Sequence, residues 1–164
     1  MNKKKQRGFT LIEMLVVIAI IAILAGAVLL AINPAETMKK GRDSTRLSDM
    51  DTLRTAINMA MAEGEITLKA MGSAKNSGSG TQVADCSGYV ECNKIGTSGL
   101  AKYIPVLPKD PINSGSYVYT FISTADDYEL NAMLESTSNK GKVENDGGNS
   151  LTKFEVGTKL DLLN

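Results

Sequence analysis

One carboxylate stands inside an otherwise apolar stretch near the N-terminus. Glu13 follows Phe9-Thr10-Leu11-Ile12 and precedes Met14-Leu15-Val16-Val17. A carboxylate within a membrane span costs about 2.5 to 3.5 kcal/mol on insertion scales, so such a group is usually paired or functional. If the chain were cut after Gly8, the new α-amino group of Phe9 would lie four residues before Glu13, on the same helix face. The spacing therefore predicts an ion pair that cleavage creates, at a helix end whose dipole also favours an acidic residue.

The two cysteines are the next groups that could do chemistry. Cys86 and Cys92 would close a short loop, and the head of the chain should be exported to a compartment where oxidation is favoured, so we expect a structural disulfide. Redox catalysis prefers a Cys-x-x-Cys motif, and this pair has five residues between its members. Zinc would need four ligands, and the sequence has no histidine and no second cysteine pair.

No other arrangement of residues suggests catalysis. The sequence has no histidine, no nucleophile elbow, no phosphate-binding glycine loop and no cluster of metal ligands. Nothing in it supports an enzyme, so no catalytic residue and no cofactor is assigned.

An uncharged apolar run must position Glu13. Residues 14–32 carry no charge, and at about 1.5 Å rise per residue their helix nearly matches a hydrocarbon core of roughly 30 Å. Four basic residues precede the run, and they are Lys3, Lys4, Lys5 and Arg7. By the positive-inside rule they keep the N-terminus cytoplasmic and send the remainder outward. Three basic residues beyond the run weaken this asymmetry, namely Lys39, Lys40 and Arg42.

Three ordinary interpretations of the apolar run compete. A secretory signal peptide would use Ala25-Gly26-Ala27 as its small-residue cleavage site, although the run is long for that role. A plain single-pass anchor needs only an apolar segment of about 20 residues. A lipoprotein would need a cysteine beside the run, and there is none. Glu13 argues against all three, because none of them has a use for a carboxylate there.

The segment Lys-Lys-Lys-Gln-Arg-Gly8-Phe9-Thr10-Leu11-Ile12-Glu13, followed by the apolar run, resembles the processing signal of type IV prepilins and pseudopilins. The resemblance covers about the first 40 residues and implies that a membrane peptidase cuts after Gly8 and methylates the new amino terminus of Phe9. It also implies that Glu13 sets the register of each subunit against its neighbour during assembly. The apolar helix would be retained and would pack at the centre of a fibre.

An amphipathic segment continues the helix beyond the membrane. Asn33-Pro34 predicts a kink, local melting or a restart, because proline costs about 3 kcal/mol inside a helix, and Asn33 could cap a new helix with Pro34 at its first position. After it an apolar stripe recurs at spacings of three and four, formed by Leu47, Met50, Leu53, Ile57 and Met61. We expect this stripe to be core. Glu63-Gly64 is the expected stop. Together the two segments are expected to make one long helix.

The remainder of the chain predicts a small sheet. Residues 72–81 are small and polar and are expected to be a flexible surface loop. Residues 117–122 alternate, residues 128–134 alternate again, and together they predict a hairpin. Asp146-Gly147-Gly148 marks a turn before a third strand at residues 154–156. The predicted fold class is α+β, with a long N-terminal helix packed against a small antiparallel sheet.

Residues 107–111, Leu-Pro-Lys-Asp-Pro, predict a rigid turn. They also resemble the segment before the sheet in major pseudopilins of type II secretion, whose later loop can bind calcium. By that resemblance, four residues with side-chain oxygens are candidate calcium ligands, namely Asn139, Glu144, Asn145 and Asp146. Their spacing matches no calcium motif, and a solvated acidic loop is the favoured interpretation.

The expected organisation has four parts. Residues 1–8 are a cleaved leader, 9–33 the transmembrane and fibre-core helix, 34–64 its amphipathic continuation and 65–164 the globular head. The expected function is a structural subunit that polymerises into a type IV pilus-like fibre. A major pseudopilin of type II secretion is one alternative, and a membrane-tethered domain that never polymerises is another.

The resemblance also implies the partners of such a subunit. These are further copies of the chain, a prepilin peptidase, an inner-membrane platform protein and an assembly ATPase. The precursor would lie in the cytoplasmic membrane and the fibre would be extracellular or periplasmic. Without the four basic leader residues the chain has 14 basic and 18 acidic residues, a net charge of −4. It lacks the large basic field that non-specific nucleic-acid binding needs, so DNA binding is unsupported.

Overall fold

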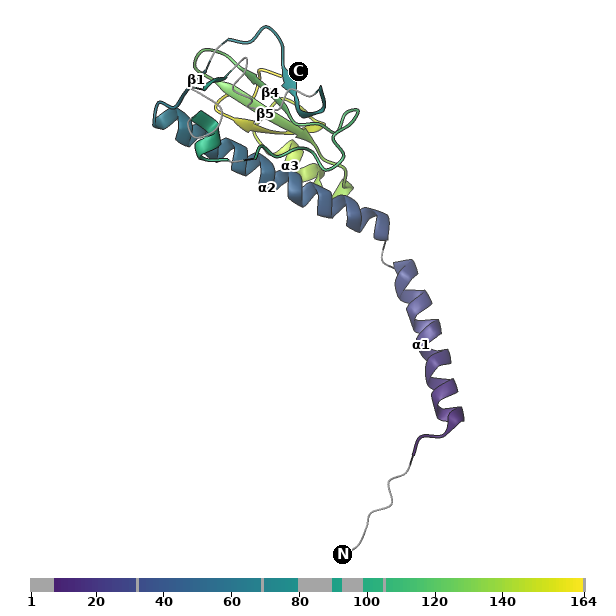
Figure 1. The fold of residues 1–164 in the computed structure, drawn as a ribbon. Helices are drawn as coiled ribbons and strands as arrows, with labels where there is room; N and C mark the ends of the chain where they lie inside the picture. Colours follow the sequence, from purple (N-terminus) through teal and green to yellow (C-terminus); the bar gives the residue numbers. More distant parts are fainter. Residues whose placement is uncertain are drawn as a thin grey trace, which may run out of the picture. The chain divides into compact units, whose positions relative to one another are not determined.

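The N-terminal apolar run forms a helix of its own. The computed structural model describes residues 8–31, 33–68, 70–79, 90–92, 99–104 and 106–163, and in it α1 spans Leu11–Ala31 (Figure 1). The chain divides into two compact units, residues 1–38 and 39–164. The side chains of residues 11–28 are all exposed. By length and composition Leu11–Val28 could cross a membrane, which would cover this apolar surface.

The second helix, α2, spans Pro34–Ala62 and has its own beginning. The Asn33 side-chain carbonyl accepts a hydrogen bond from the backbone N–H of Glu36 at 3.2 Å. Asn33 is therefore the N-cap and Pro34 the first helical residue, an arrangement that suits both residue types. The interruption expected at Asn33-Pro34 is thus a restart, because α2 starts from this new cap.

Gly64 ends α2 as expected. Its φ of +71° lies in the left-handed region that favours glycine. The N–H of Gly64 donates to the carbonyl of Met61 at 3.1 Å, and the N–H of Glu65 donates to that of Ala60 at 2.8 Å. These two bonds form a Schellman motif, which satisfies carbonyl groups that the last turn would otherwise leave without partners.

The head contains two antiparallel sheets. The larger has the strand order β2-β4-β5-β6 and the smaller pairs β1 with β3 (Figure 1). The strands are β1 (Ile66–Leu68), β2 (Lys75–Asn76), β3 (Val90–Cys92), β4 (Thr120–Ser123), β5 (Tyr128–Met133) and β6 (Lys153–Gly157). Short helical segments are η1 (Ser77–Ser79), η2 (Gly99–Lys102), η3 (Thr137–Asn139) and α3 (Lys140–Glu144). The α+β fold class is confirmed.

The core lies between α2 and the larger sheet. From α2 it takes Met50, Leu53, Ala56, Ile57 and Ala60, and from the sheet and the residue before β4 it takes Phe121, Tyr128, Leu130, Ala132 and Tyr119. The expected stripe is thus confirmed in its centre, while Leu47 and Met61 at its two ends are only half-buried. Two buried tyrosines also bind α2 through their hydroxyls, Tyr119 to Asp49 at 2.6 Å and Tyr128 to Asn58 at 2.8 Å.

The hairpin and the third strand are confirmed as β4, β5 and β6, although β4 begins three residues later than expected. The surface loop expected at residues 72–81 is wrong for residues 75–79, which form β2 and η1. Ser77 explains the order there, because it is buried and its N–H donates to the carbonyl of Tyr119 at 2.9 Å. Cys86 lies outside the described residues and Cys92 ends β3, so the disulfide stays a prediction.

Candidate functional site

Thr10 and Glu13 form a capping box at the start of α1. The Glu13 carboxylate oxygen Oε2 accepts hydrogen bonds from the Thr10 backbone N–H at 2.7 Å and from the Thr10 hydroxyl at 2.8 Å. In return the Glu13 N–H donates to the Thr10 hydroxyl oxygen at 3.3 Å. Thr10 is the N-cap and Glu13 the third helical residue, the spacing that satisfies two otherwise unpaired N–H groups. The helix therefore begins at Leu11 because of the same carboxylate that the sequence singled out.

The Gly8–Phe9 bond is exposed in the structure. Gly8 is exposed, with no neighbouring atom within 4 Å of the position that a β-carbon would take, and Phe9 is 79% exposed. In the uncut chain the nitrogen of Phe9 belongs to an amide and carries no charge. The next backbone N–H, that of Thr10, already donates a hydrogen bond to the Glu13 carboxylate. Pairing between Glu13 and a free amino group at Phe9 stays a prediction, for which the carboxylate is oriented toward the correct end of the helix.

A second site, unexpected from the sequence, joins α2 to two loops of the head. Arg46 is fully buried and binds Asp110 through two hydrogen bonds, Nε to Oδ2 at 2.6 Å and Nη2 to Oδ1 at 2.9 Å. Its Nη1 donates to Asp43 at 2.9 Å and to Glu135 at 2.6 Å. Arg42 also binds Glu135, through Nε at 2.7 Å and Nη2 at 2.6 Å. We call these five residues the charge cluster.

Backbone groups complete the partners of the charge cluster. Asp43 accepts hydrogen bonds from the N–H groups of residues 135 and 136, both at 2.8 Å. Asp110 accepts from the N–H groups of residues 112 and 113, at 2.8 and 3.3 Å. The Tyr117 ring lies 5.1 Å from the guanidinium carbon of Arg46 and adds a cation–π contact. Buried charges persist when they are paired and hydrogen-bonded in this way, so the charge cluster is an anchor of the head.

Two carboxylates of the charge cluster, Glu135 and Asp110, stay ionised at neutral pH. The hydrogen bonds from Arg42 lower the pKa of Glu135 to about 2, with Arg46 contributing in the same direction. Burial raises the pKa of Asp110, but the hydrogen bonds from Arg46 and from the backbone outweigh it, so that this pKa lies below its ordinary value. Two loops, one holding Asp110 and one Glu135, are thus held to α2 by charge-assisted hydrogen bonds.

Two carboxyl groups meet on the other face of the sheet. Glu129 on β5 and Glu155 on β6 are buried, as is Asn131, whose Cα pairs with that of Glu155 in the ladder. Glu129 Oε2 accepts hydrogen bonds from the N–H groups of residues 162 and 163, at 2.7 and 2.9 Å, which ties the C-terminal segment to the sheet. Glu155 Oε2 accepts from the N–H of Ser150 at 2.8 Å.

Burial, together with the neighbouring Glu155 carboxyl, raises the pKa of Glu129 to about 7 against the opposing effect of the backbone N–H groups. Apart from the contact between the two carboxyls, four buried polar atoms have no hydrogen-bond partner in the described part of the chain. They are Oε1 of Glu129, Oε1 of Glu155, and the side-chain nitrogen and oxygen of Asn131. The pair therefore favours one shared proton over two charges.

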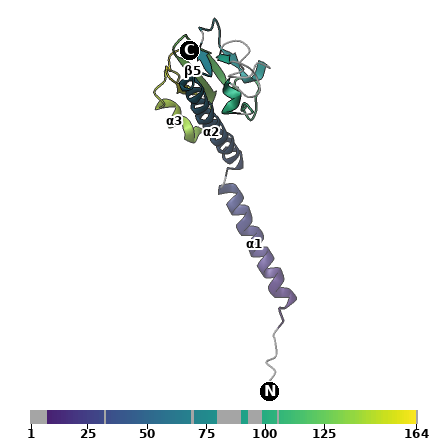
Figure 2. The same ribbon diagram turned by 60° about the vertical axis from the view of Figure 1, so that its left-hand side comes forward.

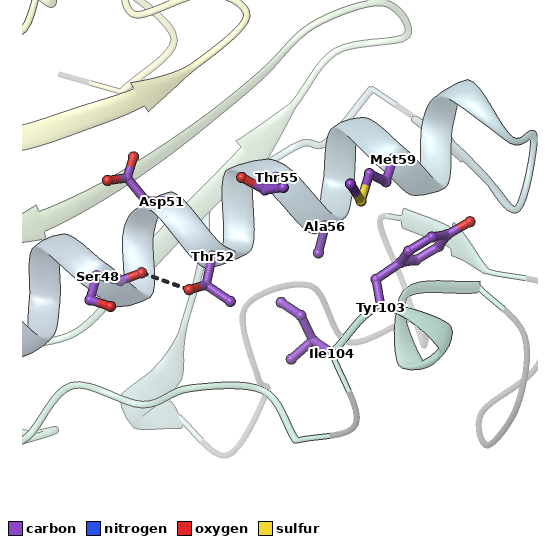
Figure 3. A pocket seen from close by; sticks show the side chains of 8 residues that line it. All are labelled: Ser48, Asp51, Thr52, Thr55, Ala56, Met59, Tyr103 and Ile104. Carbon is purple, nitrogen blue, oxygen red and sulfur yellow. Dashed lines mark hydrogen bonds between the residues drawn. The ribbon is translucent and has the colours of Figure 1, made fainter.

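A groove of about 380 Å³ runs along α2 opposite η2 (Figure 3). It is lined by Ser48, Asp51, Thr52, Thr55, Ala56, Met59, Tyr103 and Ile104. The Thr52 hydroxyl is bound to the backbone carbonyl of Ser48 at 2.8 Å, and Asp51 pairs with Arg54 at 3.0 Å. These groups are already partnered within α2, and the groove brings together no nucleophile with a base.

Three of the four residues considered for calcium have hydrogen-bond partners within the protein. The Asn139 side-chain N–H donates to Asp43 Oδ2 at 2.9 Å and that of Asn145 donates to the carbonyl of Gly141. Asp146 accepts hydrogen bonds from the N–H groups of Gly148 and Glu155, whereas Glu144 is exposed. Among the described residues no three His, Cys, Asp or Glu side chains gather as metal ligands would. Calcium binding stays a prediction; the carboxylate oxygens of Asp146 already accept hydrogen bonds from the protein, whereas Asn139 and Asn145 are held through their side-chain nitrogens.

Sequence reasoning singled out Gly8, Phe9 and Glu13, whose roles stay predictions, and did not predict the charge cluster. Its members are spread from residue 42 to residue 135, and only the fold brings them together. The one available signal was Asp110 between two prolines in residues 107–111, which was interpreted as a turn. In the structure residues 107–110 have no regular secondary structure, a bend follows at residues 111–112, and the aspartate holds Arg46.

Comparison with known proteins bears on the N-terminal segment. The family model described as "Prokaryotic N-terminal methylation motif" matches residues 3–29. No curated protein and no solved structure matched the chain significantly. The matched residues include Gly8, Phe9, the Thr10–Glu13 capping box and most of α1. The chain therefore carries the N-terminal methylation motif that marks type IV pilin-like and pseudopilin precursors.

Proposed function

We propose that the chain is a structural subunit that polymerises through α1 into a type IV pilus-like fibre after its leader is removed between Gly8 and Phe9. The observation that supports it most is the match of the methylation motif to a helix whose apolar side chains, through Val28, are all exposed. Exposed apolar surface of this extent needs lipid or other helices around it. In a fibre, copies of the same helix would replace the lipid.

Glu13 has two roles to fill in this proposal. In the uncut precursor the capping box gives its carboxylate two donors, which lowers the cost of placing it near lipid. After cleavage the amino group of Phe9, on the same chain or on a neighbour, supplies a positive charge. That ion pair would fix the axial position of each subunit.

Variants of Glu13 can separate the cap from the charge. Glu13→Gln keeps an oxygen that can accept from Thr10 but removes the charge, and glutamine is a normal partner in a capping box. We expect it to insert and to be cleaved but to build no fibres, as should Glu13→Leu. Thr10→Val, which removes the capping hydroxyl and keeps the carboxylate, is the matched control and should retain fibres.

The measurement is electron microscopy of fibres sheared from the producing cells, together with the N-terminal mass of the mature chain. An N-methylated Phe9 as first residue is the expected mass result. Normal fibres from Glu13→Gln would refute the role of the charge. A mature chain starting at Val28, or one that keeps its leader, would refute the proposal as a whole.

The remaining parts of the proposal follow from the same class of precursor. A prepilin peptidase would process the chain, and an inner-membrane platform protein and an assembly ATPase would drive its polymerisation. The N-terminus would be cytoplasmic and the head would be exported, because the four basic leader residues precede the apolar run.

A major pseudopilin is the second candidate. Residues 107–111 favour it, because they resemble the segment before the sheet in major pseudopilins. Long surface fibres at native expression would support a pilin, and their absence together with a secretion defect in the deletion strain would support a pseudopilin.

A further inference from the structure

A small pocket lies between α2 and the segment formed by η3 and α3. α3 runs beside α2 in both views (Figures 1 and 2). The pocket has a volume of about 180 Å³ and is lined by Lys40, Ser44, Leu47, Ser138, Asn139 and Lys142. Two lysines from different elements thus border one hollow that also contains hydroxyl groups.

The two walls of the pocket are held together by the charge cluster. Lys40, Ser44 and Leu47 are spaced by four and three residues and so share one face of α2. On the other wall, Asn139 donates from its side-chain nitrogen to Asp43 Oδ2 at 2.9 Å. The backbone N–H groups of residues 135 and 136 bind the same aspartate. The pocket is therefore formed before any ligand arrives, which reduces the entropy lost on binding.

The polar groups of this pocket match an anion. Lys40 and Lys142 are exposed and have no ion-pair partner in the described part of the chain. Ser44 is exposed and its hydroxyl is likewise unused there. Asp43, next to Ser44 in the chain, is buried and occupied by Arg46 and three N–H groups. Lysine ammonium groups with hydroxyl donors are the usual partners of phosphate oxygens.

The connection to α1 keeps this pocket near the membrane. At about 1.5 Å per residue, Lys40 lies about 9 Å along α2 from Pro34. The link from Ala31 to Pro34 adds at most about 3.5 Å per residue. Lys40 therefore stays within about 20 Å of the end of α1 in any arrangement of the two units. Each polar layer of a bilayer is about 5–8 Å deep, and a lysine side chain adds its own reach.

We propose that this pocket binds a phosphate-type anion, and that the headgroup of an anionic phospholipid supplies it while the precursor is in the membrane. The inference assumes the membrane-anchored precursor but not polymerisation. Binding would hold the head against the membrane surface, and assembly would have to break this contact as α1 leaves the lipid. Each lysine near an anionic surface is expected to contribute about fivefold to the affinity, and the two together about 30-fold.

The test uses the full chain, labelled with ¹⁵N, in maltoside micelles that contain no phosphate group. Phosphatidylglycerol or phosphatidylcholine is added at equal mole fractions, and inorganic phosphate is titrated separately. The amide signals of Ser44 and Ser138 are followed. The variants are K40Q, K142Q, the double variant K40Q/K142Q, and K75Q/K109Q, which removes two lysines elsewhere in the head and serves as the control.

We expect phosphatidylglycerol, and not phosphatidylcholine, to shift both amide signals. The apparent dissociation constant should rise about fivefold in each single variant and about 30-fold in K40Q/K142Q, and stay unchanged in K75Q/K109Q. Equal affinity in K40Q/K142Q, or an equal response to phosphatidylcholine, would overturn the proposal. Saturation by inorganic phosphate with no response to either lipid would assign the pocket to a soluble phosphate and overturn the lipid source. None of these results depends on whether the chain forms fibres.

Discussion

Glu129→Gln is expected to make the head more stable at high pH. In the folded chain Glu129 is buried beside Glu155, and no lysine or arginine forms an ion pair with either carboxyl in the described residues. When both are ionised, the two negative charges share a dry site. Glutamine keeps an oxygen for the N–H groups of residues 162 and 163, and its own N–H can donate to Glu155 in place of the shared proton.

The size of the effect follows from the pKa of Glu129, which rises from 4.5 to about 7 on folding. The folded state therefore holds a proton that the unfolded state releases between these values. By linkage, the free energy of unfolding falls as the pH rises from about 4.5 to about 7 and then levels off. At 1.36 kcal/mol per pKa unit, the loss is about 3 kcal/mol. Glu129→Gln has no titrating group at this position, so its free energy of unfolding should not fall over this pH range.

The assay is urea unfolding of the full chain in maltoside micelles at pH 5, 6, 7 and 8, with EDTA present so that only protons titrate the site. At pH 8 the variant should exceed the wild type by up to about 3 kcal/mol, or about 10 °C in Tm for a head of this size. Glu144→Gln, which changes an exposed carboxylate, should keep the wild-type dependence on pH. If Glu129→Gln showed the same slope between pH 5 and 7 as the wild type, the shared-proton reasoning would be refuted.

Three further predictions concern other parts of the head. Asp110→Asn leaves Arg46 buried with too little negative charge, so its free energy of unfolding in urea should fall by about 3–5 kcal/mol. The exposed control Asp51→Asn should lose less than about 0.5 kcal/mol, and equal losses in the two variants would contradict the anchoring role of Asp110. Gly64→Ala places a side chain at φ +71° and should lower the free energy of unfolding by about 1 kcal/mol, with Gly64→Asn recovering part of it, and an unchanged midpoint would disprove this cap. Calcium bound by the oxygens of residues 139–146 should raise the Tm of the wild type at about 1 mM calcium, but not that of Asp146→Asn. Equal Tm values of the wild type with and without calcium would refute calcium binding.

The parts of the fold that depend on short spacings could be predicted from the sequence. The apolar stripe of α2 was visible because helix neighbours recur at three and four residues. Gly64 and Asn33 were recognisable because caps depend on residues next to them. The hairpin of β4 and β5 was visible from alternation, which also placed Tyr128 and Leu130 in the core.

The charge cluster could not be predicted, because its energy comes from contacts between distant positions. Arg46 has the spacing of a solvated residue on α2, yet Asp110 meets it across 64 positions of the chain. Alternation likewise places Glu129 on the polar face of β5. Glu129 is buried because the C-terminal segment covers that face of the sheet. No local sequence pattern around Glu129 predicts that residues 162–163 bind it.

The separate caps of α1 and α2 have a mechanical consequence for any fibre built from this chain. Each helix nucleates its own ladder of hydrogen bonds, α1 from Thr10 and α2 from Asn33. Tension applied along the chain could therefore unravel the last turns of α1 without loosening the first turn of α2. The cap at Asn33 would act as a stop for such unravelling, so that a stretched subunit lengthens at its stem while its head stays folded.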